Sequence, residues 1–151
     1  MRPFKFRAQA ALELRRREHD EALRKRAVAE AALAAADEAV TAAEQAIAAA
    51  DQERAALMRG PVVEYARVQW HQAFRVRCVE ERAQLQARRT ERDHALQLAT
   101  QAVSQTHRRV RSLERLRDHA LAAWTLAAQL EERKLMDALA ASRFVQEGDY
   151  R

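Results

Sequence analysis

Apolar side chains recur along this chain with the seven-residue period of a coiled-coil helix. Before residue 60, one row contains Leu33, Val40 and Ile47, and a second row three positions later contains Ala36, Ala43, Ala50 and Leu57. After residue 60, the two rows contain Leu96, Val103, Val110 and Trp124, and Cys78, Leu85, Ala99, Thr106, Leu113, Ala120 and Ala127. Each half of the chain therefore predicts one long helix with a single apolar stripe.

Several residues interrupt these rows. Arg54, Arg92 and Arg117 fall where the period places a stripe residue, and Leu12 and Leu23 are separated by a step of eleven. An eleven-residue step unwinds a left-handed supercoil locally. The pattern predicts an imperfect, bendable seam between the helices.

The one strong break in the helical pattern is Gly60-Pro61. Glycine commonly closes a helix and proline fits the first turn of the next one, and the chain has only 2 Gly and 2 Pro. We expect one hairpin over residues 1–151: helix one at about 4–58, a break at 59–61, helix two at about 62–144, and a tail at 145–151. Helix two is the longer, so either it overhangs helix one or residues 62–74 form a separate short helix.

Charge changes sign along the chain and predicts how the helices pair. Residues 1–26 carry nine basic and four acidic groups, residues 27–58 carry one and six, and residues 75–117 carry eleven and five. Folding back at Gly60-Pro61 places the acidic stretch against the basic one. The predicted fold class is all-α, a long, elongated antiparallel two-helix coiled-coil hairpin, with a basic open end.

Composition agrees with this fold and indicates a compartment. The chain has 35 Ala and only 8 aromatic residues, too few large side chains for a compact core. No apolar run approaches the ~20 residues that span a bilayer, and the start of the chain lacks the apolar segment of a signal peptide. With a single cysteine, Cys78, these features predict a cytoplasmic protein without a disulfide.

Signatures of catalysis and metal binding are missing from the sequence. The five histidines include no pair spaced by four, there is no HExxH or CxxC motif, and the glycines at 60 and 148 cannot form a phosphate loop. We expect no enzyme activity, no metal and no cofactor.

Basic clusters and aromatic pairs are the candidate binding features. The basic clusters at 15–17, 24–26 and 108–111 fit a solvated helix face, an acidic protein partner or nucleic acid. Interleaved acidic residues and the lack of a base-stacking set make nucleic acid the weakest of these. Tyr65, Trp70 and Phe74 near the break either cap the hairpin core or dock a partner, and Phe4 and Phe6 present the same choice.

Short motifs mark both ends of the chain. The N-terminal motif is Phe4-Lys5-Phe6-Arg7-Ala8-Gln9, followed by Leu12, Leu14 and Arg15. The C-terminal motif is Leu113-Glu114-Arg115-Leu116-Arg117, followed by Glu132-Arg133-Lys134-Leu135-Met136-Asp137. Together these motifs resemble the FliJ family of flagellar type III export proteins. Ala8, Ala11, Arg133 and Ala138 depart from the family pattern.

The resemblance implies a fold and a role. The family's fold is a two-helix coiled coil similar to the γ subunit of rotary ATP synthases. Its role is a cytoplasmic stalk, peripheral to the inner membrane, that links the hexameric export ATPase ring to the export gate and escorts export chaperones. The resemblance implies an ATPase-side surface of Phe4, Phe6, Arg15, Arg16, Leu116 and Arg117, and a gate-side surface of Tyr65, Trp70 and Phe74. The alternatives are the similar YscO-like stalk of an injectisome, or a structural coiled-coil adaptor without an export role.

Overall fold

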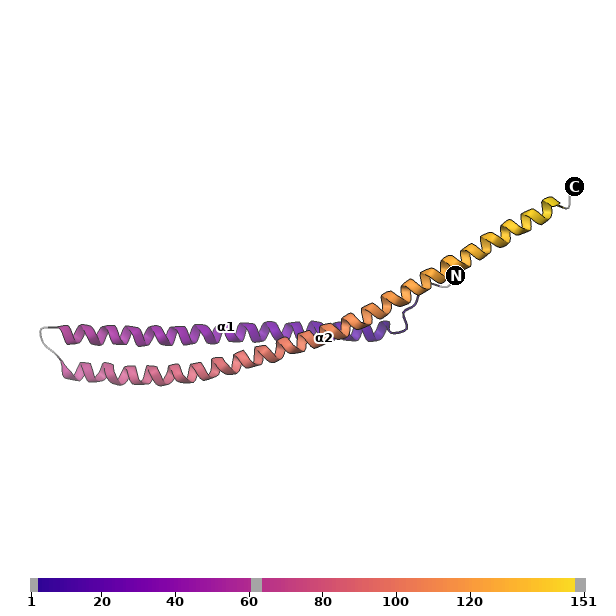
Figure 1. The fold of residues 1–151 in the computed structure, drawn as a ribbon. Coiled ribbons are helices and arrows are strands. Elements are labelled where there is room, and N and C mark those ends of the chain that lie inside the picture. Colours follow the sequence, from indigo (N-terminus) through magenta and orange to yellow (C-terminus); the bar gives the residue numbers. More distant parts are fainter. Residues whose placement is uncertain (1–2, 61–63, 149–151) are drawn as a thin grey trace. The chain divides into compact units, whose positions relative to one another are not determined.

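Two long helices make up the described part of the chain in the computed structural model. The structure describes residues 3–60 and 64–148, with side chains through residue 141. α1 spans Gln9–Arg59 and α2 spans Tyr65–Gly148 (Figure 1). The helices pack against each other and the described ranges contain no strand, which confirms the predicted all-α helical hairpin.

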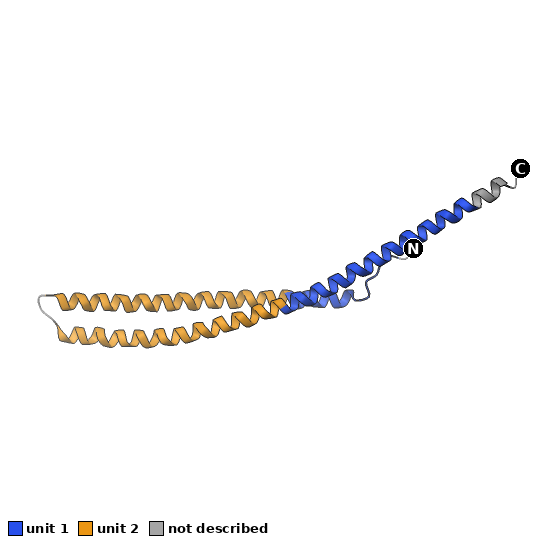
Figure 2. Ribbon diagram, in the orientation of Figure 1, with its two compact units in different colours: residues 1–19, 105–151 blue, residues 20–104 orange. Residues whose placement is uncertain are grey.

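The chain divides into two compact units, each of which contains part of α1 and part of α2. Unit 1 is Met1–His19 with Gln105–Arg151, and unit 2 is Asp20–Ser104 (Figure 2). In unit 2, α1 and α2 run side by side and are joined at one end through the Gly60-Pro61 region, of which Pro61 lies outside the described residues. Within each unit, residues later in α2 contact residues earlier in α1. The two helices are therefore antiparallel.

The seam of α1 follows one heptad register from Leu12 to Leu57. Its two rows are Leu12, His19, Arg26, Leu33, Val40 and Ile47, and Arg15, Ala22, Ala29, Ala36, Ala43, Ala50 and Leu57, all buried or half-buried. The predicted eleven-residue step is wrong, because Ala22 is 8% exposed whereas Leu23 is 41% exposed. The polar members Arg15, His19 and Arg26 had concealed the register.

The seam of α2 agrees with the predicted rows except at two positions. Cys78 and Val110 are buried, as the period requires, but Arg92 and Ala127 are exposed. Arg89 and Asp93 are half-buried on either side of Arg92. A guanidinium is costly to bury without a partner. At this point of α2, Arg89 and Asp93 face the seam in place of Arg92, which stays in solvent.

Burial is thin along the whole seam. The buried apolar residues of the described chain are Leu12, Ala22, Val40, Ala50, Cys78 and Val110, and no polar or charged residue is buried there. Alanine methyl groups bury little area and allow the helices to approach closely. Because apolar contact along the seam is limited, it favours one register only weakly, and charged side chains contribute to selecting it.

A ladder of three ion pairs connects the two helices in unit 2. Three arginines of α2 donate to three carboxylates of α1: Arg75 to Asp51 at 2.7 Å, Arg82 to Glu44 at 2.8 Å and Arg89 to Asp37 at 2.7 Å. Each step of seven residues along α2 is matched by seven in the opposite direction along α1. The ladder confirms the pairing of the acidic stretch with the basic one.

α1 begins at Gln9, five residues later than predicted. Residues 3–6 are extended, and Phe4, Phe6 and Ala8 are half-buried whereas Lys5 and Arg7 are exposed. The amide of Gln9 donates to the Phe6 carbonyl at 3.2 Å, which closes the turn into the helix. In a helix, Phe4 and Phe6 would point about 200° apart, whereas an extended segment turns both toward α2.

α2 begins at Tyr65, and no break separates residues 65–74 from the rest of the helix. The amides of Arg67 and Val68 donate to the Glu64 carbonyl, and the Glu64 carboxylate lies at the positive end of the helix dipole. Residues 62–63 of the expected short helix lie outside the described residues. At its other end α2 continues to Gly148, beyond the predicted 144, and the described side chains of residues 129–141 are all exposed.

The register of α1 predicts unequal effects for two neighbouring leucines. Leu12 is 0% exposed and Leu14 is 54% exposed. We expect Leu12→Ala to lower the free energy of unfolding by about 2–4 kcal/mol, because it removes buried methyl groups and leaves a cavity. Leu14→Ala should cost less than about 0.5 kcal/mol. Urea unfolding followed by circular dichroism measures both, and equal losses would contradict the register.

The ladder predicts that a charge swap rescues a charge reversal. Arg82→Glu should lower the melting temperature, because it replaces an attraction of about 0.2–1 kcal/mol with repulsion from Glu44. Adding Glu44→Arg should restore most of the loss. Both effects should shrink in 1 M salt, where the screening length is only about 3 Å. If the double variant melts no higher than the single one, the two side chains are not paired.

Candidate partner-binding sites

The N-terminal arm of unit 1, residues 3–8, packs on α2 and forms a concavity. The ring of Phe4 lies 6.1 Å from that of Trp124, tilted by 58°. The concavity measures about 630 Å³ and is lined by Phe4, Lys5, Phe6, Gln9, Arg117 and Leu121. Arg117 is half-buried there. Apolar walls with charged groups at the rim suit a partner side chain.

Two further residues of the predicted ATPase side are engaged within the chain. Arg15 donates to Glu18 at 2.7 Å, and Arg16 donates across the hairpin to Glu114 at 2.8 Å. Arg111 also approaches Glu114, at 3.5 Å. The hydrogen bond from Arg16 lowers the pKa of Glu114 below its usual 4.5. Arg15 and Arg16 therefore contribute to the hairpin before they contact any partner.

Leu116 does not join the other five residues of this set. It is exposed, and it points about 100° round the helix from Arg117. The structure thus brings Phe4, Phe6 and Arg117 together, places Arg15 and Arg16 further along α1, and leaves Leu116 on another face of α2.

A histidine pair in unit 1 was not predicted from the sequence. Nδ1 of His19 lies 3.0 Å from the hydroxyl of Thr106, and its ring lies 5.5 Å from that of His107. The usable signal was the heptad spacing, since His19 stands seven residues after Leu12 and seven before Arg26.

At the joined end of unit 2, an exposed aromatic stack marks the start of α2. Trp70 and Phe74 are one helical turn apart, and their rings stack with centroids 5.5 Å apart and planes within 2°. Trp70 also meets His71 edge to face at 4.9 Å. Trp70 is 57% exposed and Tyr65 is also exposed, while Phe74 is half-buried. Tyr65 and Trp70 therefore do not cap the hairpin core.

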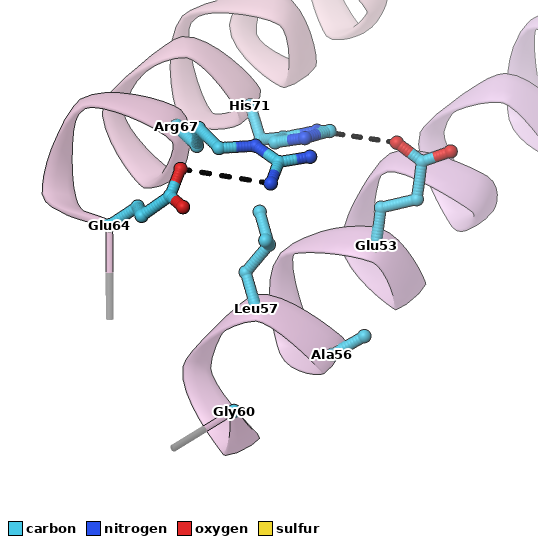
Figure 3. Close-up of a pocket in the computed structure, with 7 residues that line it drawn as sticks. All are labelled: Glu53, Ala56, Leu57, Gly60, Glu64, Arg67 and His71. Carbon is cyan, nitrogen blue, oxygen red and sulfur yellow. Dashed lines mark ion pairs between the residues drawn. The ribbon is translucent and has the colours of Figure 1, made fainter. Parts of the chain in front are cut away.

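A polar pocket of about 540 Å³ lies at the same end of unit 2 (Figure 3). It is lined by Glu53, Ala56, Leu57, Gly60, Glu64, Arg67 and His71. Glu64 and Arg67 approach to 3.7 Å. Nδ1 of His71 lies 3.4 Å from the Glu53 carboxylate but makes no hydrogen bond, although the atom is buried. The lining of this pocket therefore carries both signs of charge and comes from both helices.

Within residues 3–60 and 64–148, no helix combines the length and apolarity of a membrane span. The side chains described there include no cluster of three histidine, cysteine, aspartate or glutamate residues suited to a metal ion.

Comparisons with known proteins do not assign the chain to a family. No protein-family model, no characterised protein and no solved structure matches it significantly.

The ion pair between Arg16 and Glu114 predicts a pH dependence. Because the pKa of Glu114 is lower in the folded protein than in the unfolded chain, its ionisation stabilises the fold above about pH 4.5, and this contribution is lost as the pH falls through the lowered value. Arg16→Gln should therefore reduce the loss of melting temperature between about pH 5 and pH 3. Arg17→Gln, which removes an exposed neighbouring cation, is the matched control. Identical pH profiles for wild type and Arg16→Gln would contradict the assignment.

Proposed function

We propose that this chain is a non-catalytic stalk of a flagellar type III export apparatus, connecting the export ATPase ring to the membrane export gate and escorting export chaperones. One observation carries the proposal. The N-terminal motif and the first part of the C-terminal motif that resemble the FliJ family are far apart in the chain, yet in unit 1 Phe4, Phe6 and Arg117 line one concavity. Arg16, directly after the N-terminal motif, pairs with Glu114 of the C-terminal one. Because residues of the two motifs lie close together in the fold, we infer that they form one binding surface and are not two unrelated helical segments.

The ATPase-binding surface in this proposal is the arm of unit 1 and its neighbours. Phe4 and Phe6 offer partly exposed rings, and Arg117 adds a cation in the same concavity. Arg15 and Arg16 add positive charge along α1, and Leu116 adds an exposed apolar side chain. Aromatic and arginine side chains are the residues that most often dominate binding energy at interfaces.

The gate-binding surface is the aromatic stack of unit 2. Tyr65 and Trp70 are exposed, and the stacked Phe74 holds the indole ring in one orientation. A rigid, exposed aromatic pair loses little conformational entropy on binding. In this role the protein acts in the cytoplasm, at the periphery of the inner-membrane export apparatus.

Purified components test the proposal through a reciprocal loss of binding. The full-length chain should bind both the export ATPase and the cytoplasmic domain of the export gate from its own organism. Trp70→Ala should weaken gate binding at least tenfold and leave ATPase binding unchanged. Phe6→Ala should do the reverse. Surface plasmon resonance measures both affinities, and failure of the wild type to bind either component would refute the proposal.

A charge swap distinguishes a direct contact of Arg16 with the ATPase from its role in the stability of the hairpin. Arg16→Glu with Glu114→Arg retains an ion pair across the hairpin but moves the positive charge from α1 to α2. If Arg16 contacts the ATPase, this variant should melt lower than wild type only by the lost contact of Arg111 with Glu114, and still bind the ATPase more weakly. Wild-type affinity in the swapped variant would restrict Arg16 to a structural role. The same assays with injectisome components distinguish the injectisome stalk, and binding to neither set leaves the structural adaptor.

A further inference from the structure

A continuous exposed stripe runs along the outer face of α2 in unit 1. We call it the outer stripe, and it consists of Arg108, Arg111, Arg115, Leu116, Leu126 and Leu130, all exposed. Successive members are separated by three, four, one, ten and four residues, and at about 100° per residue all six lie within about 140° of one another round the helix. The seam residues Val110, Leu113 and Trp124 lie on the opposite side. The outer stripe is therefore turned away from α1 and the N-terminal arm.

The first half of the outer stripe is basic and incompletely neutralised. Within the described residues, neither Arg108 nor Arg115 makes an ion pair, and Arg111 approaches Glu114 only at 3.5 Å. These arginines, with His107 and Ser112, line a concavity of about 330 Å³. By contrast, the arginines of the ladder in unit 2 are each paired with a carboxylate of α1. The stripe thus keeps positive charge that the fold does not use.

The second half of the outer stripe is apolar. Leu126 and Leu130 are one helical turn apart, and Leu116 lies next to Arg115, ten residues before Leu126. Single exposed leucines are ordinary on protein surfaces, but aligned ones mark contacts with other proteins. Since the seam uses the opposite face of α2, no segment described in this unit covers these leucines.

We propose that the outer stripe binds an amphipathic helix of a partner protein, with carboxylates along one half of its contact face and aliphatic side chains along the other. The stripe from Arg108 to Leu130 is about 33 Å long at 1.5 Å per residue. A partner helix of about six turns matches this length, and charge complementarity fixes its orientation. The stripe does not depend on the proposed export role, because its residues and charges stand on their own.

Other occupants fit this surface less well. A second copy docked antiparallel through the same stripe would place arginines opposite leucines, and a parallel copy would place arginines opposite arginines. Nucleic acid would match the arginines, but the leucine half would face phosphates and the stripe has no aromatic residue on which bases could stack. Only the amphipathic acidic helix satisfies both halves.

Synthetic peptides test the proposal with the full-length chain. Two 24-residue helical peptides carry glutamates in one half of a face and leucines in the other, with the acidic half first in one peptide and last in the other. A third peptide has the same composition scrambled. Fluorescence anisotropy should show that one of the two patterned peptides binds at least tenfold more tightly than the scrambled one.

Matched variants locate the binding site. Arg108→Glu with Arg115→Glu should weaken binding of the preferred peptide at least tenfold, and Leu126→Ala with Leu130→Ala at least fivefold. The control, Arg77→Glu with Arg88→Glu, makes the same charge change at exposed arginines of unit 2 and should change affinity less than twofold. Circular dichroism verifies that each variant folds.

Three results would overturn the proposal. They are no preference for either patterned peptide, equal weakening by the two arginine pairs, and tighter binding of duplex DNA than of peptide with the same dependence on Arg108 and Arg115. None of these assays contains an export component, so their failure would leave the proposed function untouched.

Discussion

Burial along one narrow stripe of each helix is the constraint on which this fold depends. Two antiparallel helices can bury only the faces they turn toward each other, and here those faces are rich in alanine. The burial gained per turn is small, so apolar contact alone would select the register weakly. The ladder from Asp51 and Arg75 to Asp37 and Arg89 adds a repeating charge match that only the antiparallel register satisfies.

The sequence predicts the hairpin well because its two determinants, heptad spacing and the sign of charge, are both periodic. The sequence predicts burial less well where the residue type does not match the burial of its position. Leu23 looks like a seam residue but is exposed, because the register is set by the whole row and passes through Ala22. The extended arm was missed although Phe4 and Phe6 alternate with basic residues, a two-residue period that a helix cannot turn to one side. The outer stripe could not be predicted from the seam pattern, because Leu126 and Leu130 lie off both rows and only the structure shows that they are exposed.

A fold with so little interior leaves most of its side chains available for contact. Natural monomers seldom align exposed aromatic or aliphatic groups without a use for them. In this chain such groups are gathered in distinct places: the arm concavity near Phe6, the stack of Trp70 on Phe74, and the leucines of the outer stripe. Each of these three surfaces consists of different residues, as the proposal of separate partners requires.

Distances between spin labels in unit 2 test the antiparallel heptad register most directly. Cysteine replaces Glu44 in a Cys78→Ala background, and a second cysteine replaces Arg75, Arg82 or Arg89 in turn. Seven residues displace a label by about 10.5 Å along the helix, so the distance should be shortest for Arg82 and longer for both of the others, and dilution with unlabelled chain should not change it. A distance that rises or falls steadily from Arg75 to Arg89, or a signal lost on dilution, would contradict the hairpin.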